Sequence, residues 1–421
     1  MIFSKLARIS AFQPYRYSEN AGRLDDLVTQ PYDKISPEMQ KGYLERSPHN
    51  LVRVILGERF DKDTESENVY TRAAKYLNEW IGSGILQKEK EPSLYAYFQE
   101  FVLPDTGERL TRKGFIGLGA VEDYSEGTVH RHEQTLSGPK KDRRQLLEVT
   151  RAHFGQIFML YSDPECRMDA LLDEAAHSTP TASVTDEYGT THTLYRISDP
   201  KKVRAIQQQM QDKKLLIADG HHRYETALQF SKDHPESKDA KWVMMTFVNL
   251  HSPGLRILAT HRVVTGLPEF DPDTFFSKVG ESFQVSKYDT IGALRQLWEE
   301  PALDRIRIAV LPKGGEAVWH LERDRRNGEL DVEVLHSELL EGALGIDAEA
   351  VREQKFLKYV RGIDAAADPV ENDEAEYAFL LEATTINQVA DSAFNGRCMP
   401  QKSTDFYPKL LSGLTIYRLE K

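Results

Sequence analysis

The chain has 421 residues and a formal net charge of −12, with 40% hydrophobic and 29% charged residues. This length exceeds what one hydrophobic core usually supports, so we expect two or three domains. The acidic charge disfavours non-specific binding to nucleic acid or anionic membranes. No apolar run approaches the ~20 residues that cross a bilayer, and the first residues carry charges that a signal peptide core lacks, so we expect a cytoplasmic protein.

In chain order, the predicted strands and helices mix without strict alternation, which favours an α+β fold. The predicted helices cover residues 66–84, 141–153, 168–176, 224–232, 272–279, 291–299 and 332–344. The predicted strands cover 94–103 and 109–121 as a hairpin, 156–161, a second hairpin turning at 187–189, 215–218, 241–249, 255–264, 283–288, 305–311, 317–321 and 377–381. A polar interval rich in Asp, Glu and Ala covers 364–376, and Glu374 and its neighbours are expected to form a solvated loop.

The two cysteines do not predict a metal site or a disulfide. Cys166 and Cys398 lie far apart and outside any C-x-x-C spacing. We expect both to be unreactive core thiols.

The segment 215–227 is the most informative part of the sequence. A short apolar strand ends in Asp-Gly and a helix follows, so first-turn N–H groups, the Asp219 carboxylate, the His221 and His222 imidazoles and the Arg223 guanidinium surround one point. Such a point suits a phosphate, with Asp219 able to bind a divalent cation or accept a proton. Alternatively, Asp219 caps the helix and the histidines lie on the surface.

A second candidate group precedes the helix predicted at 141–153. His130, His132 and Glu133 lie on an extended segment, and the helix start is basic, with Lys140 and Arg143. A carboxylate beside imidazoles could transfer protons while the basic helix start neutralises phosphate. The segment could equally be a surface loop, and a zinc site at His130 and His132 lacks an evident third ligand.

Two weaker signals lie near the ends of the chain. The segment 399–409 is too polar for a core strand and contains two lysines, Lys402 and Lys409, that could neutralise phosphate. A structural loop is the alternative. Near the other end, 30–35 resembles a turn, and 50–54 resembles a strand whose arginine, Arg53, could point into a cavity.

Together these motifs resemble the domain of unknown function (DUF) 1015 family, in the same order and over nearly the whole chain. The residues that carry the resemblance are Pro31-Tyr32-Asp33, Asn50-Leu51-Val52-Arg53, His132-Glu133 with Thr135, Pro139-Lys140, Asp142-Arg143, Ala218-Asp219-Gly220-His221-His222-Arg223, and Met399-Pro400 with Lys402-Ser403-Thr404. The Asp-Gly-His-His-Arg segment is also similar to the phosphate-binding corner of the ParB and sulfiredoxin superfamily, which includes kinases of free serine. Relatives of the family are serine kinases that use pyrophosphate.

The resemblance implies a ParB/sulfiredoxin-like mixed α+β core with a smaller α+β subdomain. We expect a catalytic region at 1–262, a subdomain at 263–325 that could be inserted, and a C-terminal segment at 326–421 that returns to the active site. The implied activity is phosphorylation of a small hydroxy metabolite, with free L-serine as the expected substrate and O-phosphoserine as the product. The implied phosphate donor is pyrophosphate or a nucleotide, with Mg²⁺ as cofactor.

The resemblance also implies roles for individual residues. Phosphate binding is assigned to Gly220, His221, His222, Arg223, Lys140, Arg143, Lys402 and Ser403. Catalysis is assigned to Glu133, Asp219, His221 and His222, with Glu133 or Asp219 as general base and Asp219 as the expected Mg²⁺ ligand. Substrate binding is assigned to Asn50, Arg53, His132 and Thr135.

Two other functional classes stay open from the sequence. The chain could be a ParB-like nucleotide-binding switch that hydrolyses slowly, or a phosphohydrolase that uses the same phosphate cradle. No Walker A pattern is present, so the sequence does not choose between a nucleotide and pyrophosphate. We expect small-molecule partners, no membrane and no nucleic acid; the oligomeric state is open.

Overall fold

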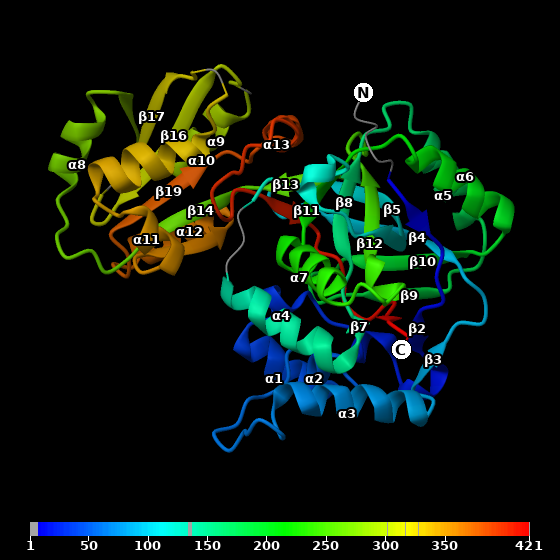
Figure 1. Cartoon of the computed structure of the whole chain (residues 1–421). Helices are drawn as coiled ribbons and strands as arrows, with labels where there is room; N and C mark the ends of the chain where they lie inside the picture. Colours follow the sequence, from blue (N-terminus) through cyan, green and yellow to red (C-terminus); the bar gives the residue numbers. More distant parts are fainter. Residues whose placement is uncertain (1–6, 134–136, 301, 316, 327, 421) are drawn as a thin grey trace. The chain divides into compact units, whose positions relative to one another are not determined.

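The computed structural model describes residues 7–133, 137–300, 302–315, 317–326 and 328–420 (Figure 1). The chain forms two compact units. The first contains the chain up to Arg256 together with the chain from Pro408 onwards, and the second contains Ile257–Tyr407. The functional regions expected at 1–262, 263–325 and 326–421 stay a prediction.

The first unit is built on a mixed sheet in the order β6-β11-β8-β12-β5-β4-β10-β9, with β1 paired to β5. Its strands are β1 (Ile9–Ser10), β4 (Leu94–Val102), β5 (Arg109–Ala120), β6 (Val129–His130), β8 (Ile157–Tyr161), β9 (Ala182–Thr185), β10 (Thr191–Ile197), β11 (Leu215–Asp219) and β12 (Trp242–Asn249). β4 and β5 form the predicted antiparallel hairpin, with Val102 opposite Arg109. Most pairs are antiparallel, but β11 is parallel to β6 and β12 is parallel to β8.

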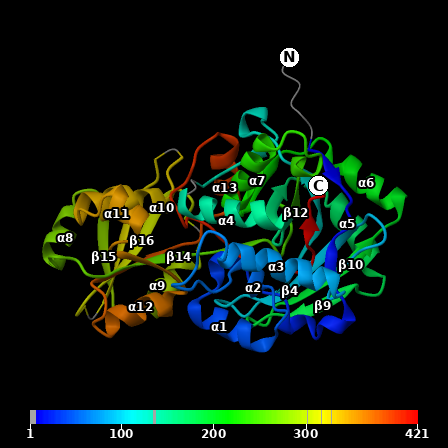
Figure 2. The ribbon, with the colours of Figure 1, turned by 60° about the horizontal axis from the view of Figure 1, so that its bottom comes forward.

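Helices surround this sheet. They are α1 (Pro37–Arg46), α2 (Val52–Ile55), α3 (Val69–Gly82), α4 (Ser137–Thr150), α5 (Arg167–Ala176), α6 (Pro200–Met210) and α7 (His221–Asp233). α4 packs against both α3 and α7, and α5 packs against α6 (Figures 1 and 2). The core is made by apolar side chains that alternate along the central strands, such as Ile157 and Met159 of β8, each fully buried.

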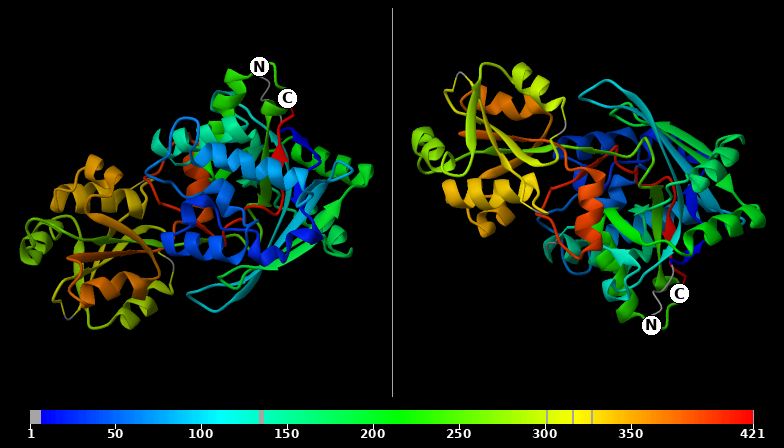
Figure 3. Two further views of the ribbon diagram at one scale, coloured as in Figure 1. Left: turned by 90° about the horizontal axis from the view of Figure 1, so that it is seen from below. Right: turned by 90° about the horizontal axis from the view of Figure 1, so that it is seen from above.

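The end of the chain belongs to the first unit. Short strand β21 (Tyr417–Arg418) pairs with β7 (Ala152–His153), and β2 (Tyr15–Tyr17) pairs with β3 (Leu86–Lys88). Figure 3 shows the C-terminal segment, in red, among the elements of this unit. Isolated bridges of Ile416 with Tyr15 and of Ser412 with Thr29 join the end of the chain to the N-terminal segments.

The second unit contains a six-stranded sheet among its described residues, in the order β15-β17-β16-β19-β14-β18. The strands are β14 (Thr260–Val264), β15 (Gln284–Tyr288), β16 (Arg305–Pro312), β17 (Val318–Asp324), β18 (Leu357–Arg361) and β19 (Tyr377–Leu381), and β13 (Arg256–Leu258) pairs with β20 (Asp405–Tyr407). The helices are α8 (Pro272–Val279), α9 (Ile291–Trp298), α10 (Asp331–Val334), α11 (Ala348–Glu353), α12 (Ile363–Glu371) and α13 (Ile386–Phe394). α9 and α12 pack on the face that carries Ala309 and Ala378, while α8 packs Phe275 on Tyr377 and Phe379 of the other face (Figure 2).

The predicted α+β class is confirmed. Glu374 and the two residues before it lie in an exposed turn, as expected, but the sequence did not predict α12, which occupies most of the polar interval 364–376. Ile363, Ala366, Ala367 and Val370 recur at helical spacing and are buried or partly buried against the sheet, with the acidic residues between them. The acidic composition concealed this apolar face.

One strand prediction is wrong, because the segment 50–54 contains the short helix α2. The helix expected at 332–344 is confirmed, as α10 followed by a π-helix at Leu335–Ala343. The expected strand 255–264 is divided into β13 and β14.

Two further observations concern the cysteines and the apolar character of the helices. Cys166 and Cys398 are free and only partly buried, so the expectation that both lie in the core is wrong. None of the described helices combines the length and apolarity that a bilayer crossing requires.

Candidate active site

The two predicted catalytic segments meet because their strands are parallel. β6 and β11 pair in parallel, so their carboxyl ends lie at the same edge of the sheet. β6 leads into His132 and Glu133, and β11 ends in Asp219. The Nδ1–H group of the fully buried His132 donates to the carbonyl oxygen of Ile217 at 2.8 Å, which fixes the first segment to β11.

The turn from β11 into α7 depends on Gly220. Its backbone is left-handed, with φ 96°, a conformation that L side chains rarely adopt. A Cβ atom there would also lie 3.0–3.2 Å from the guanidinium of Arg223. Gly220 therefore allows both the tight turn and the return of Arg223 towards the strand end.

Helix α7 begins at His221, three residues before the start predicted from the sequence. Gly220 is the N-cap residue, and among the described residues no side chain caps this helix end. The alternative that Asp219 caps the helix is therefore wrong. The first-turn N–H groups of α7 point out of a helix end, where the macrodipole favours an anion.

Asp219 lies among positive charges. Its Oδ2 atom is 3.7 Å from Lys409 Nζ and 3.9 Å from Arg223 Nη2. Burial alone would raise the pKa of Asp219, but the charges of Lys409, Arg223 and Lys34 outweigh burial and hold the pKa well below its usual range. Asp219 is therefore ionised at neutral pH and is a poor proton acceptor.

His132 and His221 are buried, His222 is partly buried, and all three are neutral at pH 7. Burial lowers the pKa of His132 to about 3 and that of His221 to about 4. The two rings meet edge to face, with centroids 4.8 Å apart. Burial also lowers the pKa of His222. These imidazoles can donate or accept a hydrogen bond at neutral pH, but they do not supply positive charge.

One ring nitrogen of His221 is without a hydrogen bond to any residue that the structure describes. Its side chain is 5% exposed, and its Nε2 atom has no hydrogen-bond partner among the described residues. A buried polar atom without a partner is costly in a folded protein and usually marks a site that a ligand or water completes. The other ring nitrogen, Nδ1, lies 4.0 Å from Oε2 of Glu133. Glu133 is thus placed next to the helix start that carries His221.

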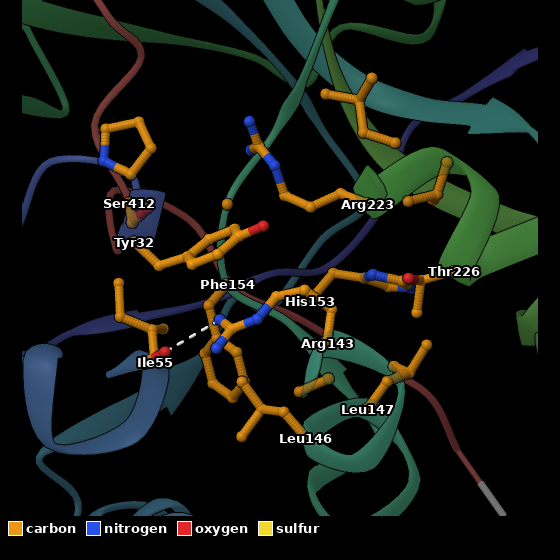
Figure 4. A pocket seen from close by; sticks show the side chains of 15 residues that line it. Tyr32, Ile55, Arg143, Leu146, Leu147, His153, Phe154, Arg223, Thr226 and Ser412 are labelled. Atoms are coloured by element: carbon orange, nitrogen blue, oxygen red, sulfur yellow. Dashed lines mark hydrogen bonds between the residues drawn. The ribbon is translucent and has the colours of Figure 1, made fainter. Parts of the chain in front are cut away.

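Arg223 lines a small cavity beside this corner (Figure 4). Arg223 donates to the carbonyl oxygen of Gln156, and a Cβ atom on Gly155 would lie 3.1 Å from its Nη1 atom. On the other side of the cavity, the Arg143 guanidinium lies 3.9 Å from the ring centroid of Tyr32. Tyr32, Arg143 and Arg223 thus line the same cavity.

Arg143 and Lys140 are partly engaged by other groups. Arg143 donates to the carbonyl oxygen of Ile55 at 2.8 Å and pairs with Asp142. Lys140 Nζ lies 3.1 Å from Oε2 of Glu225, a residue in the second turn of α7. Arg143 and Lys140 both lie on α4, which packs against α7. Their expected contact with phosphate stays a prediction.

The residues assigned to substrate binding are placed differently. Asn50 is fully buried, donates to the carbonyl oxygen of Asp26 at 2.8 Å and accepts from the N–H of Val52 at 2.9 Å. Arg53 donates to the carbonyl oxygen of Leu44 at 2.8 Å. These contacts hold the main chain around α2. Thr135 lies outside the described residues.

Lys402 and Ser403 belong to the second unit. Lys402 has a left-handed backbone, with φ 57°, and the buried Arg262 donates to its carbonyl oxygen at 3.2 Å. Ser403 Oγ donates to the carbonyl oxygen of Pro400. The predicted contact of Lys402 and Ser403 with phosphate stays a prediction.

The sequence prediction missed Lys34 and the closeness of Lys409 to Asp219. Lys34 ends the 3-10 helix Tyr32–Lys34, and its charge lowers the pKa of Asp219. Both lysines stand in segments that the sequence had singled out, 30–35 and 399–409, but nothing in the sequence places either one beside Asp219. Of the two lysines in the later segment, the site prediction chose Lys402.

The donor set for a metal is small. Within the described ranges, no three His, Cys, Asp or Glu side chains gather as a metal cluster. His130 Nε2 donates to the carbonyl oxygen of Gly127 at 3.1 Å, and His132 is bound to Ile217, so both candidate zinc ligands are held by main chain. A single carboxylate such as Asp219 still fits Mg²⁺, which is usually held by one or two carboxylates together with substrate phosphates.

Fold and site together define a mixed α+β protein with an uncapped helix start among cationic side chains. The sequence matches the family described as "Protein of unknown function (DUF1015)" over residues 9–346, and the chain belongs to this family. No curated protein matches the chain.

Several solved structures are similar to the chain at low identity. A free serine kinase in complex with AMP is 12% identical, covers 70% of this chain and 89% of its own, and has a TM-score of 0.38. A conserved hypothetical protein from Pyrococcus furiosus is 12% identical, with coverage of 68% and 91% and a TM-score of 0.35. SbnI with C-terminal truncation, from Staphylococcus aureus, is 10% identical, with coverage of 71% and 87% and a TM-score of 0.35.

Proposed function

We propose that the protein is a phosphotransferase that moves a phosphoryl group from pyrophosphate or a nucleotide to the hydroxyl group of a small metabolite, with free L-serine as the first acceptor to test. The observation that carries the proposal is the start of α7, where, among the described residues, no side chain caps the helix and the buried His221 Nε2 atom has no hydrogen-bond partner, while Asp219 lies among cations. Phosphoryl transfer depends on positioning and charge stabilisation more than on covalent catalysis. This corner offers both.

In the proposed complex, the phosphate donor lies at the start of α7. The first-turn N–H groups and the guanidinium of Arg223 bind its oxygens, and Lys409 neutralises their charge. His221, which is neutral, contributes a hydrogen bond through Nε2 and adds no charge. This arrangement explains why a buried imidazole nitrogen and an uncapped helix end occur at the same place.

Glu133 is the general base in this proposal. Asp219 is unsuited to the role because its pKa is held well below the usual range, and a base works best with a pKa near the working pH. Glu133 accepts the proton of the acceptor hydroxyl, whose oxygen forms the new P–O bond. The bridging P–O bond of the phosphate donor breaks at the same time, and the remainder leaves as phosphate or as the shortened nucleotide.

Asp219 fits a second role as the protein ligand of Mg²⁺ that arrives with the phosphate donor. When bound, the ion would neutralise charge on the donor oxygens. The chain itself then needs only to orient that ion and the phosphates, which a single ionised carboxylate between Lys409 and Arg223 can do.

The experiment is a direct assay of the purified full-length protein. Serine and Mg²⁺ are incubated with pyrophosphate, ADP, ATP or CTP, and phosphoserine is measured by mass spectrometry. The proposal predicts phosphoserine with at least one phosphate donor, and its absence from the Glu133→Gln variant. Arg131→Gln is the matched control, because Arg131 is an exposed neighbour that pairs with Glu225.

Two results would contradict the proposal. Consumption of a nucleotide or pyrophosphate without any phosphorylated acceptor, with threonine and homoserine also tested, would indicate a hydrolase or a nucleotide-dependent switch. Full activity of Glu133→Gln would remove Glu133 from the mechanism.

A further inference from the structure

A chain of buried hydrogen bonds crosses the first unit away from the site itself. His192 Nε2 lies 3.1 Å from Oδ2 of Asp186, and His192 Nδ1 lies 2.6 Å from the hydroxyl of Tyr97. The side chains of Asp186 and His192 are 3% and 0% exposed, and Tyr97 is 1% exposed. We call these three residues the Asp–His–Tyr chain.

The direction of these hydrogen bonds follows from their partners. Because Asp186 accepts, His192 Nε2 carries the proton, and burial lowers the pKa of His192, which favours the neutral ring. His192 Nδ1 then accepts from the Tyr97 hydroxyl. The Tyr97 oxygen keeps a lone pair, with which it accepts the main-chain N–H of Leu411 at 3.4 Å.

At its Tyr97 end, the Asp–His–Tyr chain holds the segment that carries Lys409. Residues 408–411 lie in no strand, so their main-chain groups need other partners. Besides the contact of Tyr97 with Leu411, the Gln99 Nε2–H group donates to the carbonyl oxygen of Lys409 at 2.9 Å.

Arg112 completes this support. Its Nε–H group donates to Gln99 Oε1 at 2.9 Å, and another of its N–H groups donates to the carbonyl oxygen of Pro408. Arg112 is 1% exposed, so its guanidinium lies inside the unit, where it holds the main chain of the 408–411 segment in place. The strands β4 and β5 thus supply side chains for hydrogen bonds that the 408–411 segment cannot make in a sheet.

The Asp186 end of the chain holds the segment that carries Lys34. Gln30 Nε2–H donates to Asp186 Oδ2 at 3.0 Å, and the Gln30 main-chain N–H donates to the hydroxyl of Tyr43. Gln30 is 1% exposed and directly precedes the turn that ends in Lys34. One connected network therefore reaches both lysine segments that act on Asp219.

We infer that the Asp–His–Tyr chain consists of positioning residues, which hold Lys34 and Lys409 beside Asp219 so that both charges face the phosphate donor. The inference rests on the proposed function. Asp186 also accepts the N–H groups of Tyr188 and Thr190 in its own hairpin turn, so a purely structural role is the competing explanation. The two explanations differ in what happens to the 408–411 segment.

The test is Tyr97→Phe with Tyr95→Phe as the matched control. Both tyrosines lie on β4 and are almost fully buried, but the Tyr95 hydroxyl has no hydrogen-bond partner in the described ranges. In Tyr97→Phe, amide exchange at Leu411 should rise about fivefold, the effect of one net hydrogen bond. Exchange at Leu419, whose N–H binds the carbonyl of Arg151, should rise no more than global stability requires.

The kinetic readout separates positioning from folding. Tyr97→Phe should raise the KM for pyrophosphate about fivefold with a smaller change in kcat, because Lys409 is bound less firmly in place, while Tyr95→Phe should keep both constants. If Tyr97→Phe does not fold, Gln99→Glu replaces it: the carboxylate still accepts from Arg112 but no longer donates to Lys409. The same rise in exchange and KM is expected.

Unchanged exchange at Leu411 in a folded variant would overturn the inference, whatever the activity. Equal effects of Tyr97→Phe and Tyr95→Phe would do the same. If the wild-type protein transfers no phosphoryl group, the proposed function fails, and the exchange of Leu411 still decides whether the Asp–His–Tyr chain holds the segment.

Discussion

An aspartate stands at the start of both α6 and α7, but at α7 it lies one residue further from the helix. Both helices follow a strand of the first unit. α6 begins after Asp199, whose carboxylate accepts the N–H of Lys201 at 2.8 Å, with Pro200 in the first helical position. At α7 the aspartate stands one residue earlier, and Gly220 occupies the cap position.

This single shift changes what the aspartate can do. The Asp199 carboxylate accepts a first-turn N–H group of its own helix, which is the usual role of an N-cap residue. Asp219 leaves the first turn of α7 uncapped and directs its charge to Lys409 and Arg223. The Asp219 carboxylate is therefore available to a ligand, whereas the Asp199 carboxylate is used by its own helix.

Substitution of Asp219 and of Asp199 should change the rate of phosphoryl transfer very differently, and this is the greatest difference that we expect. Asp219→Asn should lower phosphoryl transfer by roughly 10²–10³-fold, because the variant keeps the side-chain size but loses the charge that organises the phosphate site. Its thermal unfolding should change only modestly. Turnover measured under saturating serine and pyrophosphate is the readout.

Asp199→Ala should show the reverse pattern. Loss of the α6 cap should cost about 1 kcal/mol of unfolding free energy, measured by urea denaturation, and leave turnover as in the wild type. Wild-type turnover in Asp219→Asn, or loss of turnover in Asp199→Ala, would remove the distinction drawn between the two helix starts.

The next effect is acid sensitivity, which the α7 start should show and the α6 start should not. The folded pKa of His221 is lowered to about 4, below the unfolded value of about 6.5. Between these values the unfolded chain binds a proton that the folded chain does not, so the free energy of unfolding falls as the pH falls through this window. His221 alone could contribute roughly 3 kcal/mol to this loss.

His221→Asn should therefore flatten the dependence of stability on pH between about 6.5 and 4. Urea denaturation at a series of pH values measures it. His177 is exposed and serves as the control position, since His177→Asn should retain the wild-type slope. An unchanged slope in His221→Asn would mean that His221 does not stay neutral in the folded protein.

The smallest expected effect concerns the cations near each helix start. Lys409→Met should weaken pyrophosphate binding about tenfold, because a charged hydrogen-bonding partner of the phosphate is lost. Isothermal titration calorimetry measures the affinity. Lys201→Met at the α6 start is the matched control, since Lys201 is exposed and lies in the first turn of a helix whose start is capped by Asp199. Equal affinity in both variants would place Lys409 outside the phosphate site.

Sequence patterns located most of the elements and the central part of the site. The apolar run of β11 followed by Asp-Gly and a helical period predicted a strand-to-helix corner, because these signals depend on residues close together in the chain. The same local signals predicted the β4–β5 hairpin. In α12 the polar composition concealed the apolar residues at helical spacing, so this helix was not predicted.

Local patterns in the sequence predict the α+β class and the strand-to-helix corner at Asp219, and the motifs together indicate the family of the protein. The distant residues that complete the corner are brought to it by the fold. Lys34 and Lys409 reach Asp219 through packing of segments almost 200 residues away, and parallel pairing of β6 with β11 brings in Glu133. No local pattern encodes such pairings, because strand order and the contacts of loops depend on the whole sheet.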